Sequence, residues 1–157
     1  MSIEKVRSFF RPLGREQDIL EFPVSSATVE LAAQAVGVIP ARIAKTLSFL
    51  VEEDCVLIVT AGDARIDNKK YKAFFHTKAK MLTPEQVSQL TGHAIGGVCP
   101  FGNPPGVRAY LDVSLKRFET VFPAAGSSNS AIELTCDELE RYSDCLEWVD
   151  LCKDWEK

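Results

Sequence analysis

The sequence lacks the features that mark membrane and secreted proteins. None of its 157 residues falls in a run of about 18 apolar residues, the length that a membrane-spanning helix requires. Residues 1–14 show no apolar core followed by a small-residue cleavage site, so no secretory signal peptide is expected. We therefore expect a cytoplasmic protein without a membrane partner.

Metal-binding and common catalytic motifs are also missing. The five cysteines are odd in number and have no CxxC spacing, and only two histidines are present. Zinc sites and disulfide frameworks need denser and more regular patterns, so we expect reduced thiols, no metal and no cofactor. The nucleophile motif GxSxG, the zinc motif HExxH and the glycine-rich nucleotide fingerprints are absent as well.

The charge is weakly acidic in total and unevenly distributed. A net charge of −4 argues against a protein that grips nucleic acid over its whole surface, and DNA is not an expected partner. Residues 65–80, however, carry six cations and one anion, whereas residues 133–157 carry nine acids and three bases. One side of the molecule is therefore predicted to attract phosphates.

Composition and patterning predict one globular domain over residues 1–157. The hydrophobic share of 46% and the charged share of 25% are average for such proteins. Apolar spacing predicts a helix at 29–36 that Ser26 can cap, and capping residues predict helices after Asp67, Thr83 and Thr135. Strands are predicted at 45–51 and 55–60 as an antiparallel hairpin, and later at 107–111, 119–122 and 131–134. This order indicates an α+β fold around a mixed, barrel-like sheet.

Lys45 is the first candidate site residue, because it places an ammonium in an otherwise apolar predicted strand. A lysine at a strand end commonly extends its charge into water, and this reading stays open here. Alternatively the side chain points into a cleft, where it can hold a phosphate or polarise a carbonyl oxygen.

Two loops are further candidates. Residues 96–102 hold glycines that let a backbone approach a ligand closely and expose N–H donors, although a plain turn explains them equally well. Residues 124–130 are small and polar, and they form either a hairpin turn or the wall of a small pocket. Cys99, with His93 as its base, is a weak candidate for a nucleophile.

Several short motifs, in this order and spacing, resemble the YbaK/prolyl-tRNA editing family, the free-standing relatives of the insertion domain in bacterial prolyl-tRNA synthetases. The resemblance spans roughly residues 26–142. The motifs that carry it are Ala44-Lys45-Thr46-Leu47, the loop from Gly96 to Pro100 continued by Phe101-Gly102, Asp112-Val113-Ser114, and Ala125-Gly126 followed by Ile132-Glu133-Leu134.

The resemblance implies a trans-editing deacylase that hydrolyses the ester of mischarged tRNA, expected to be tRNA-Pro carrying a small non-cognate amino acid such as cysteine or alanine. It implies that Lys45 is the catalytic residue at the 3′ aminoacyl end. The basic segment would then contact the tRNA backbone through Lys69, Lys70 and Lys72. The implied substrate-binding residues are Thr46, Gly96, Gly97, Val98, Cys99, Pro100, Gly126, Ser127 and Asn129.

One departure and two alternatives accompany this hypothesis. Some relatives carry a histidine after the alanine-glycine segment, where this chain has Ser127 to Ser130, so the amino acid preference is open. A non-catalytic module that binds tRNA or an aminoacyl-tRNA synthetase is one alternative function. A thiol hydrolase acting through Cys99 is the other.

Overall fold

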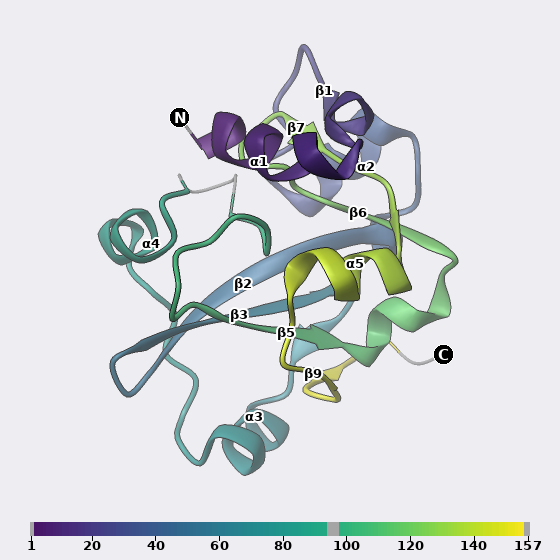
Figure 1. The fold of residues 1–157 in the computed structure, drawn as a ribbon. Coiled ribbons are helices and arrows are strands. Elements are labelled where there is room, and N and C mark those ends of the chain that lie inside the picture. Colours follow the sequence, from purple (N-terminus) through teal and green to yellow (C-terminus); the bar gives the residue numbers. More distant parts are fainter. Residues whose placement is uncertain (1, 94–97, 156–157) are drawn as a thin grey trace.

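A mixed six-stranded sheet, curled into a half-barrel, forms the centre of the protein (Figure 1). The computed structural model describes residues 2–93 and 98–155. The strand order is β8-β6-β2-β3-β5-β9. Strands β2 and β3 are antiparallel, as are β6 and β8, whereas β2–β6, β3–β5 and β5–β9 are parallel pairs. The α+β prediction with a barrel-like sheet is confirmed. The strands are β2 (Ile43–Val51), β3 (Asp54–Ala61), β5 (Arg108–Asp112), β6 (Thr120–Pro123), β8 (Leu134–Thr135) and β9 (Glu147–Val149).

The long hairpin β2–β3 forms the centre of this sheet. Its strands pair from Ala44 with Ala61 to Val51 with Asp54, which confirms the predicted hairpin. Residues 56–59 are all valine, leucine or isoleucine, and they are completely buried because hydrophobic clusters pack against both faces of β3. Lys45 therefore lies on a strand with little freedom to move.

Short helices surround the sheet (Figure 1). Asp67 caps α3, and Thr83 and Thr135 form the predicted capping boxes of α4 and α5. The cap of α2 was predicted wrongly: Thr28 accepts the Leu31 N–H, whereas Ser26 donates its own N–H to the Ser128 carbonyl at 2.6 Å. The helices are α1 (Ser2–Phe10), α2 (Val29–Val36), α3 (Asn68–Phe75), α4 (Pro84–Thr91) and α5 (Cys136–Ser143).

Two small antiparallel ribbons tie distant segments together. Strand β1 (Leu20–Glu21) pairs with β7 (Ser130–Ala131), and β4 (Arg65–Ile66) pairs with β10 (Cys152–Lys153). The predicted strand at 131–134 is thus two strands, β7 and β8, which belong to different sheets. Short 3-10 helices fill the connections: η1 (Arg11–Leu13), η2 (Glu16–Asp18), η3 (Pro40–Arg42) and η4 (Val113–Arg117).

The main hydrophobic core joins both ends of the described chain to the sheet. Val6 and Phe10 of α1 and Cys152 of β10 are completely buried in one cluster with Leu111 and Leu139. In the described part of the chain, no helix has the length and apolar character needed to cross a membrane.

Candidate functional site

A pocket of about 370 Å³ opens between β2, the start of α2, strand β7 and residues 81–87. Most of its wall is apolar, with Ala44, Leu47 and Phe122 among the contributors. Of the described residues that line it, only Lys45 carries a charge. An apolar pocket with one charged group and a few hydroxyls is the usual form of a site for a small organic group.

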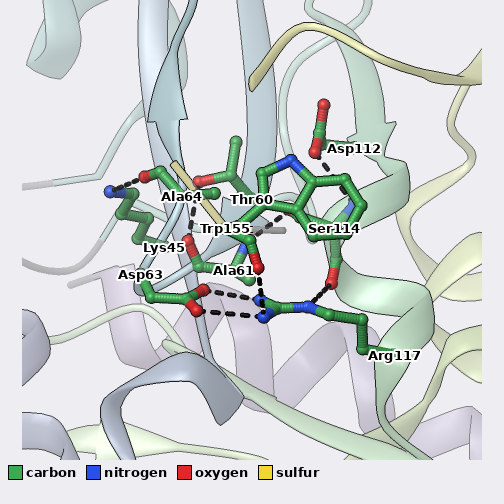
Figure 2. Close-up of polar contacts among 9 residues, drawn as sticks. All are labelled: Lys45, Thr60, Ala61, Asp63, Ala64, Asp112, Ser114, Arg117 and Trp155. Carbon is green, nitrogen blue, oxygen red and sulfur yellow. Dashed lines mark hydrogen bonds and ion pairs between the residues drawn. The ribbon is translucent and has the colours of Figure 1, made fainter. Parts of the chain in front are cut away.

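The Lys45 side chain is held in a defined position inside this pocket. Its ammonium donates a hydrogen bond to the Ala64 carbonyl at 2.6 Å (Figure 2). Burial is the main cause that lowers the pKa of Lys45 below the ordinary value for lysine, and the nearby Asp63 carboxylate opposes it. The Lys45 side chain thus does not extend freely into solvent. Two of its three N–H donors have no hydrogen-bond partner among the described residues and can serve a ligand.

Hydroxyl groups complete the polar part of the pocket. Thr46 lines it next to Lys45, and the Thr46 hydroxyl oxygen is buried with no hydrogen-bond partner among the described residues. Ser26, Ser48 and Ser130 also contribute to the lining. A buried hydroxyl without a partner costs free energy, so Thr46 is suited to a ligand that supplies the missing hydrogen bond.

The glycine-proline loop reaches the pocket at Val98, which is one of its lining residues. Gly96 and Gly97 lie outside the described residues. Pro100 lines a different hollow of about 430 Å³, together with Phe9, Asn103 and Tyr142 among others. Of the loop residues named as substrate contacts, the structure therefore brings Val98 to Lys45 and places Pro100 away from it.

Cys99 is completely buried, and its sulfur lies 3.7 Å from His93 Nε2. The predicted neighbours therefore do meet, in the core and away from the pocket lining. Burial raises the pKa of the Cys99 thiol to about 12 and lowers that of His93. A neutral, buried thiol is a poor nucleophile.

The small polar segment around Gly126 forms a turn beside the pocket. The Ser127 hydroxyl donates to Asn129 Oδ1 at 2.9 Å, and the Asn129 amide donates to the Phe22 carbonyl at 3.0 Å. The pocket lining includes Ala124 before this turn and Ser130 after it. The roles of Gly126, Ser127 and Asn129 in substrate binding stay predictions. The polar side chains of Ser127 and Asn129 hold the turn in place.

The cationic residues of the basic segment are not equivalent. Lys69, Lys72 and Lys78 line a hollow of about 410 Å³ beside α3. The Lys70 ammonium instead lies 2.9 Å from the Asp150 carboxylate and 3.0 Å from the Cys152 carbonyl. Lys78 therefore occupies the place beside Lys69 and Lys72 that sequence reasoning gave to Lys70.

Sequence analysis did not predict several residues that line the Lys45 pocket, because no local sequence pattern identifies them. Thr28 caps α2, and Met81 and Leu82 lie on a segment that follows the edge of β2, where the Leu82 N–H donates to the Ser48 carbonyl at 3.1 Å. Both segments look like ordinary connections in the sequence. Their contribution follows from tertiary packing alone.

The chain is similar in sequence and structure to proteins related to aminoacyl-tRNA editing. A solved structure described as a "putative trans-editing enzyme for prolyl tRNA synthetase" superposes with a TM-score of 0.87 and 33% identity, covering 97% of each chain. The "Uncharacterized protein YwhH" of Bacillus subtilis (strain 168) is 59% identical over 157 residues, which are 99% of this chain and all of that protein.

Full-length synthetases match over a smaller part. The proline–tRNA ligase of Leuconostoc citreum (strain KM20) is 31% identical over 86 residues, which are 54% of this chain and 15% of the ligase. The family described as "Aminoacyl-tRNA editing domain" matches residues 24–142, a range that includes Lys45 and its pocket. The chain belongs to the aminoacyl-tRNA editing domain family, the YbaK-like relatives of the prolyl-tRNA ligase insertion domain.

Proposed function

We propose that the protein is a trans-editing deacylase that hydrolyses the ester of mischarged tRNA, with tRNA-Pro carrying alanine or cysteine as its substrate. The observation that carries the proposal is the half-buried Lys45 ammonium, the one charged group among the described residues of a small apolar pocket. Membership of the editing domain family and the relation to prolyl-tRNA ligases support it. The chain acts as one domain in this proposal.

The pocket favours a small, uncharged amino acid. Its lining gives apolar contacts from Ala44, Leu47 and Val98, and hydroxyls from Thr46 and Ser130. An acidic or basic side chain would lose its hydration without gaining an opposite charge in the described lining, apart from an acid placed against Lys45. Alanine and cysteine fit this environment.

Lys45 acts on the reacting ester in this proposal. A water molecule adds to the ester carbonyl, the bond to the ribose oxygen breaks, and that oxygen takes up a proton as the amino acid leaves. Negative charge develops on the carbonyl oxygen, and the fixed N–H donors of Lys45 stabilise it in a mostly apolar pocket. An aminoacyl ester is already activated, so orientation of the ester and the water supplies much of the remaining rate.

Replacement of Lys45 tests the proposal. Lys45→Ala should lower single-turnover hydrolysis of Ala-tRNA-Pro by about thirtyfold to nearly a thousandfold, the effect of losing about 2 to 4 kcal/mol of transition-state stabilisation. Lys45→Arg should recover little activity, because a planar guanidinium does not reproduce a compact ammonium. Thermal melting of each variant controls for folding. Near-normal hydrolysis by folded Lys45→Ala would remove Lys45 from the mechanism.

The same assay separates the alternatives. A binding-only module would retain tRNA without releasing free amino acid. A Cys99-dependent hydrolase would lose activity on alkylation of Cys99, which its burial opposes. A panel of charged tRNAs identifies the amino acid and the tRNA. Association with an aminoacyl-tRNA synthetase is a further proposal, and co-purification with the prolyl enzyme tests it.

A further inference from the structure

The acceptor of the Lys45 hydrogen bond lies in a tightly fixed turn. Ala64 is completely buried, and its N–H donates to the Ala61 carbonyl at 3.0 Å, which closes residues 61–64 between β3 and β4. Gly62 lies against η3, where a Cβ would stand 2.1 Å from the Pro40 carbonyl oxygen. The turn therefore has little room to shift without displacing its neighbours.

A bidentate ion pair holds the exposed side of this turn. The two terminal nitrogens of Arg117 donate to the two Asp63 carboxylate oxygens at 3.0 and 2.5 Å (Figure 2). Such fork-to-fork pairs fix orientation as well as distance. Since Asp63 is the residue directly before Ala64, the pair constrains the carbonyl that receives the Lys45 ammonium.

Arg117 is itself fixed from several directions. Its Nε donates to the Ser114 carbonyl at 2.9 Å, and a terminal nitrogen donates to the Trp155 carbonyl at 3.1 Å. The guanidinium also lies 5.0 Å from the centre of the Trp155 ring and 4.9 Å from that of Phe118. A guanidinium with this many contacts loses little further freedom on binding a carboxylate.

The helix η4 that carries Arg117 also holds the other end of the turn. The Ser114 hydroxyl accepts the Ala61 N–H at 3.1 Å inside the core. The Asp112 carboxylate accepts the Ser114 N–H at 2.9 Å (Figure 2). It also accepts the Leu151 N–H at 2.8 Å. Helix η4 thus holds Ala61 and Asp63, two residues of the turn that precede Ala64, the acceptor of the Lys45 hydrogen bond.

We propose that Asp63 and Arg117 are positioning residues for Lys45: their ion pair fixes the Ala64 carbonyl, and that carbonyl aims the ammonium at the substrate ester. The inference rests on the proposed function of Lys45. It assigns a role in the reaction to an ion pair that lies outside the described pocket lining.

Charge provides a second link between Asp63 and Lys45. The titratable groups that act on the ammonium come from four segments: the Cys152 thiol of β10, Asp63 of the turn, Arg65 of β4 and Glu30 of α2. Burial raises the pKa of the Cys152 thiol, so the charged groups at neutral pH are Asp63, Arg65 and Glu30. Asp63 favours the ammonium and Arg65 disfavours it, while burial lowers the Lys45 pKa overall. Neutralising Asp63 should therefore lower the pKa further, so the ammonium would be lost at a lower pH.

Single-turnover hydrolysis of Ala-tRNA-Pro tests the positioning role. Arg117→Ala should lower the rate about tenfold to a hundredfold at saturating enzyme, because a misplacement near 1 Å has effects of this size. The enzyme concentration for half-maximal rate should stay unchanged, and Arg117→Lys should recover part of the rate. Arg11→Ala is the matched control, since Arg11 makes an exposed bidentate pair with Glu16 at 3.0 and 2.7 Å.

Titration of Lys45 by NMR gives a readout that does not depend on turnover. Asp63→Asn should lower the Lys45 pKa and move the alkaline limb of the rate profile to lower pH, whereas the control Glu16→Gln should change neither. A wild-type rate in folded Arg117→Ala, or an unchanged Lys45 pKa in Asp63→Asn, would overturn the inference. If the wild-type protein hydrolyses no charged tRNA, the proposed function fails, and the titration still decides the link between Asp63 and Lys45.

Discussion

Cys99 illustrates how burial decides the chemistry of a side chain. A sulfur 3.7 Å from an imidazole nitrogen is the arrangement of a thiol and its base. Here both groups are completely buried, and burial alone moves the thiol pKa up to about 12 while it disfavours the imidazolium. The proton therefore stays on sulfur at neutral pH.

Cys99→Ser should retain most of the deacylase activity, because this residue supports the loop next to Val98 without taking part in the reaction. The measurement is single-turnover hydrolysis, with thermal melting and the rate of iodoacetamide labelling followed in parallel. Wild-type Cys99 should react slowly with the reagent. An acyl-thioester trapped on Cys99, or a loss of rate beyond about a hundredfold, would instead favour covalent catalysis.

The candidate site was predictable from the sequence only where one residue carries the signal. Lys45 stands out because a charge interrupts an apolar strand, and the family resemblance named its neighbour Thr46. Ala64, which accepts the Lys45 hydrogen bond, is separated from it by 19 positions and has no distinctive side chain. Its role depends on the carbonyl alone, which every residue type possesses.

Among the elements, helix α3 and the residues after it collect positive charge at one surface. Lys69, Lys72 and Lys78 line one hollow, and in the described part of the chain none of the three forms an ion pair with an acid. Like charges that are held together without a counterion repel each other, and an anionic ligand relieves the repulsion. We therefore propose that these three lysines contact the tRNA backbone.

The combined change Lys69→Ala, Lys72→Ala and Lys78→Ala should weaken binding of several tRNAs alike. It should also reduce the slope of log affinity against log salt by about 2 to 3, because fewer counterions are released. Lys70→Ala should have a smaller effect, since Asp150 already engages that ammonium. Lys116→Ala, whose ammonium lies over the Trp148 ring, is the control. An unchanged affinity and salt slope in the triple variant would place the contact elsewhere.

Prediction succeeded for elements whose signal is local. The Thr83 and Thr135 capping boxes are read from four consecutive residues, and the β2–β3 hairpin from two apolar runs around an acidic turn. The pairing of the two-residue strands β1 with β7 and β4 with β10 was out of reach, because each strand pairs with a partner far along the chain. The order of strands in the central sheet could not be predicted for the same reason, because it joins segments that are far apart in the sequence.

At the scale of the whole molecule, the structural unit extends beyond the family match at 24–142. On the N-terminal side, Phe10 is completely buried, with ring centres 5.0 Å from Phe101 and 5.5 Å from Tyr142. On the C-terminal side, Leu151 is buried against the β5 and β9 side of the sheet, in a cluster with Tyr110 and Val149. Both flanking segments therefore share the core of the editing domain, and we propose that residues 1–157 fold as one cooperative domain.

Phe10→Ala tests this view of the molecule. The change removes a fully buried ring outside the family match and should lower the free energy of unfolding by about 3 to 5 kcal/mol, the usual effect of a large cavity. Leu13→Ala is the matched control, because Leu13 lies three residues away with 45% of its surface exposed. Its replacement should lower the free energy of unfolding by about 0.5 kcal/mol or less.

Urea unfolding followed by tryptophan fluorescence and by far-UV circular dichroism gives the free energy of unfolding of both variants. The two signals should coincide in wild type and variant, since Trp148 and Trp155 pack on the same core cluster as Phe10. Two separate transitions, or a loss no larger than that of Leu13→Ala, would show that the N-terminal segment is an appendage to an independent editing domain.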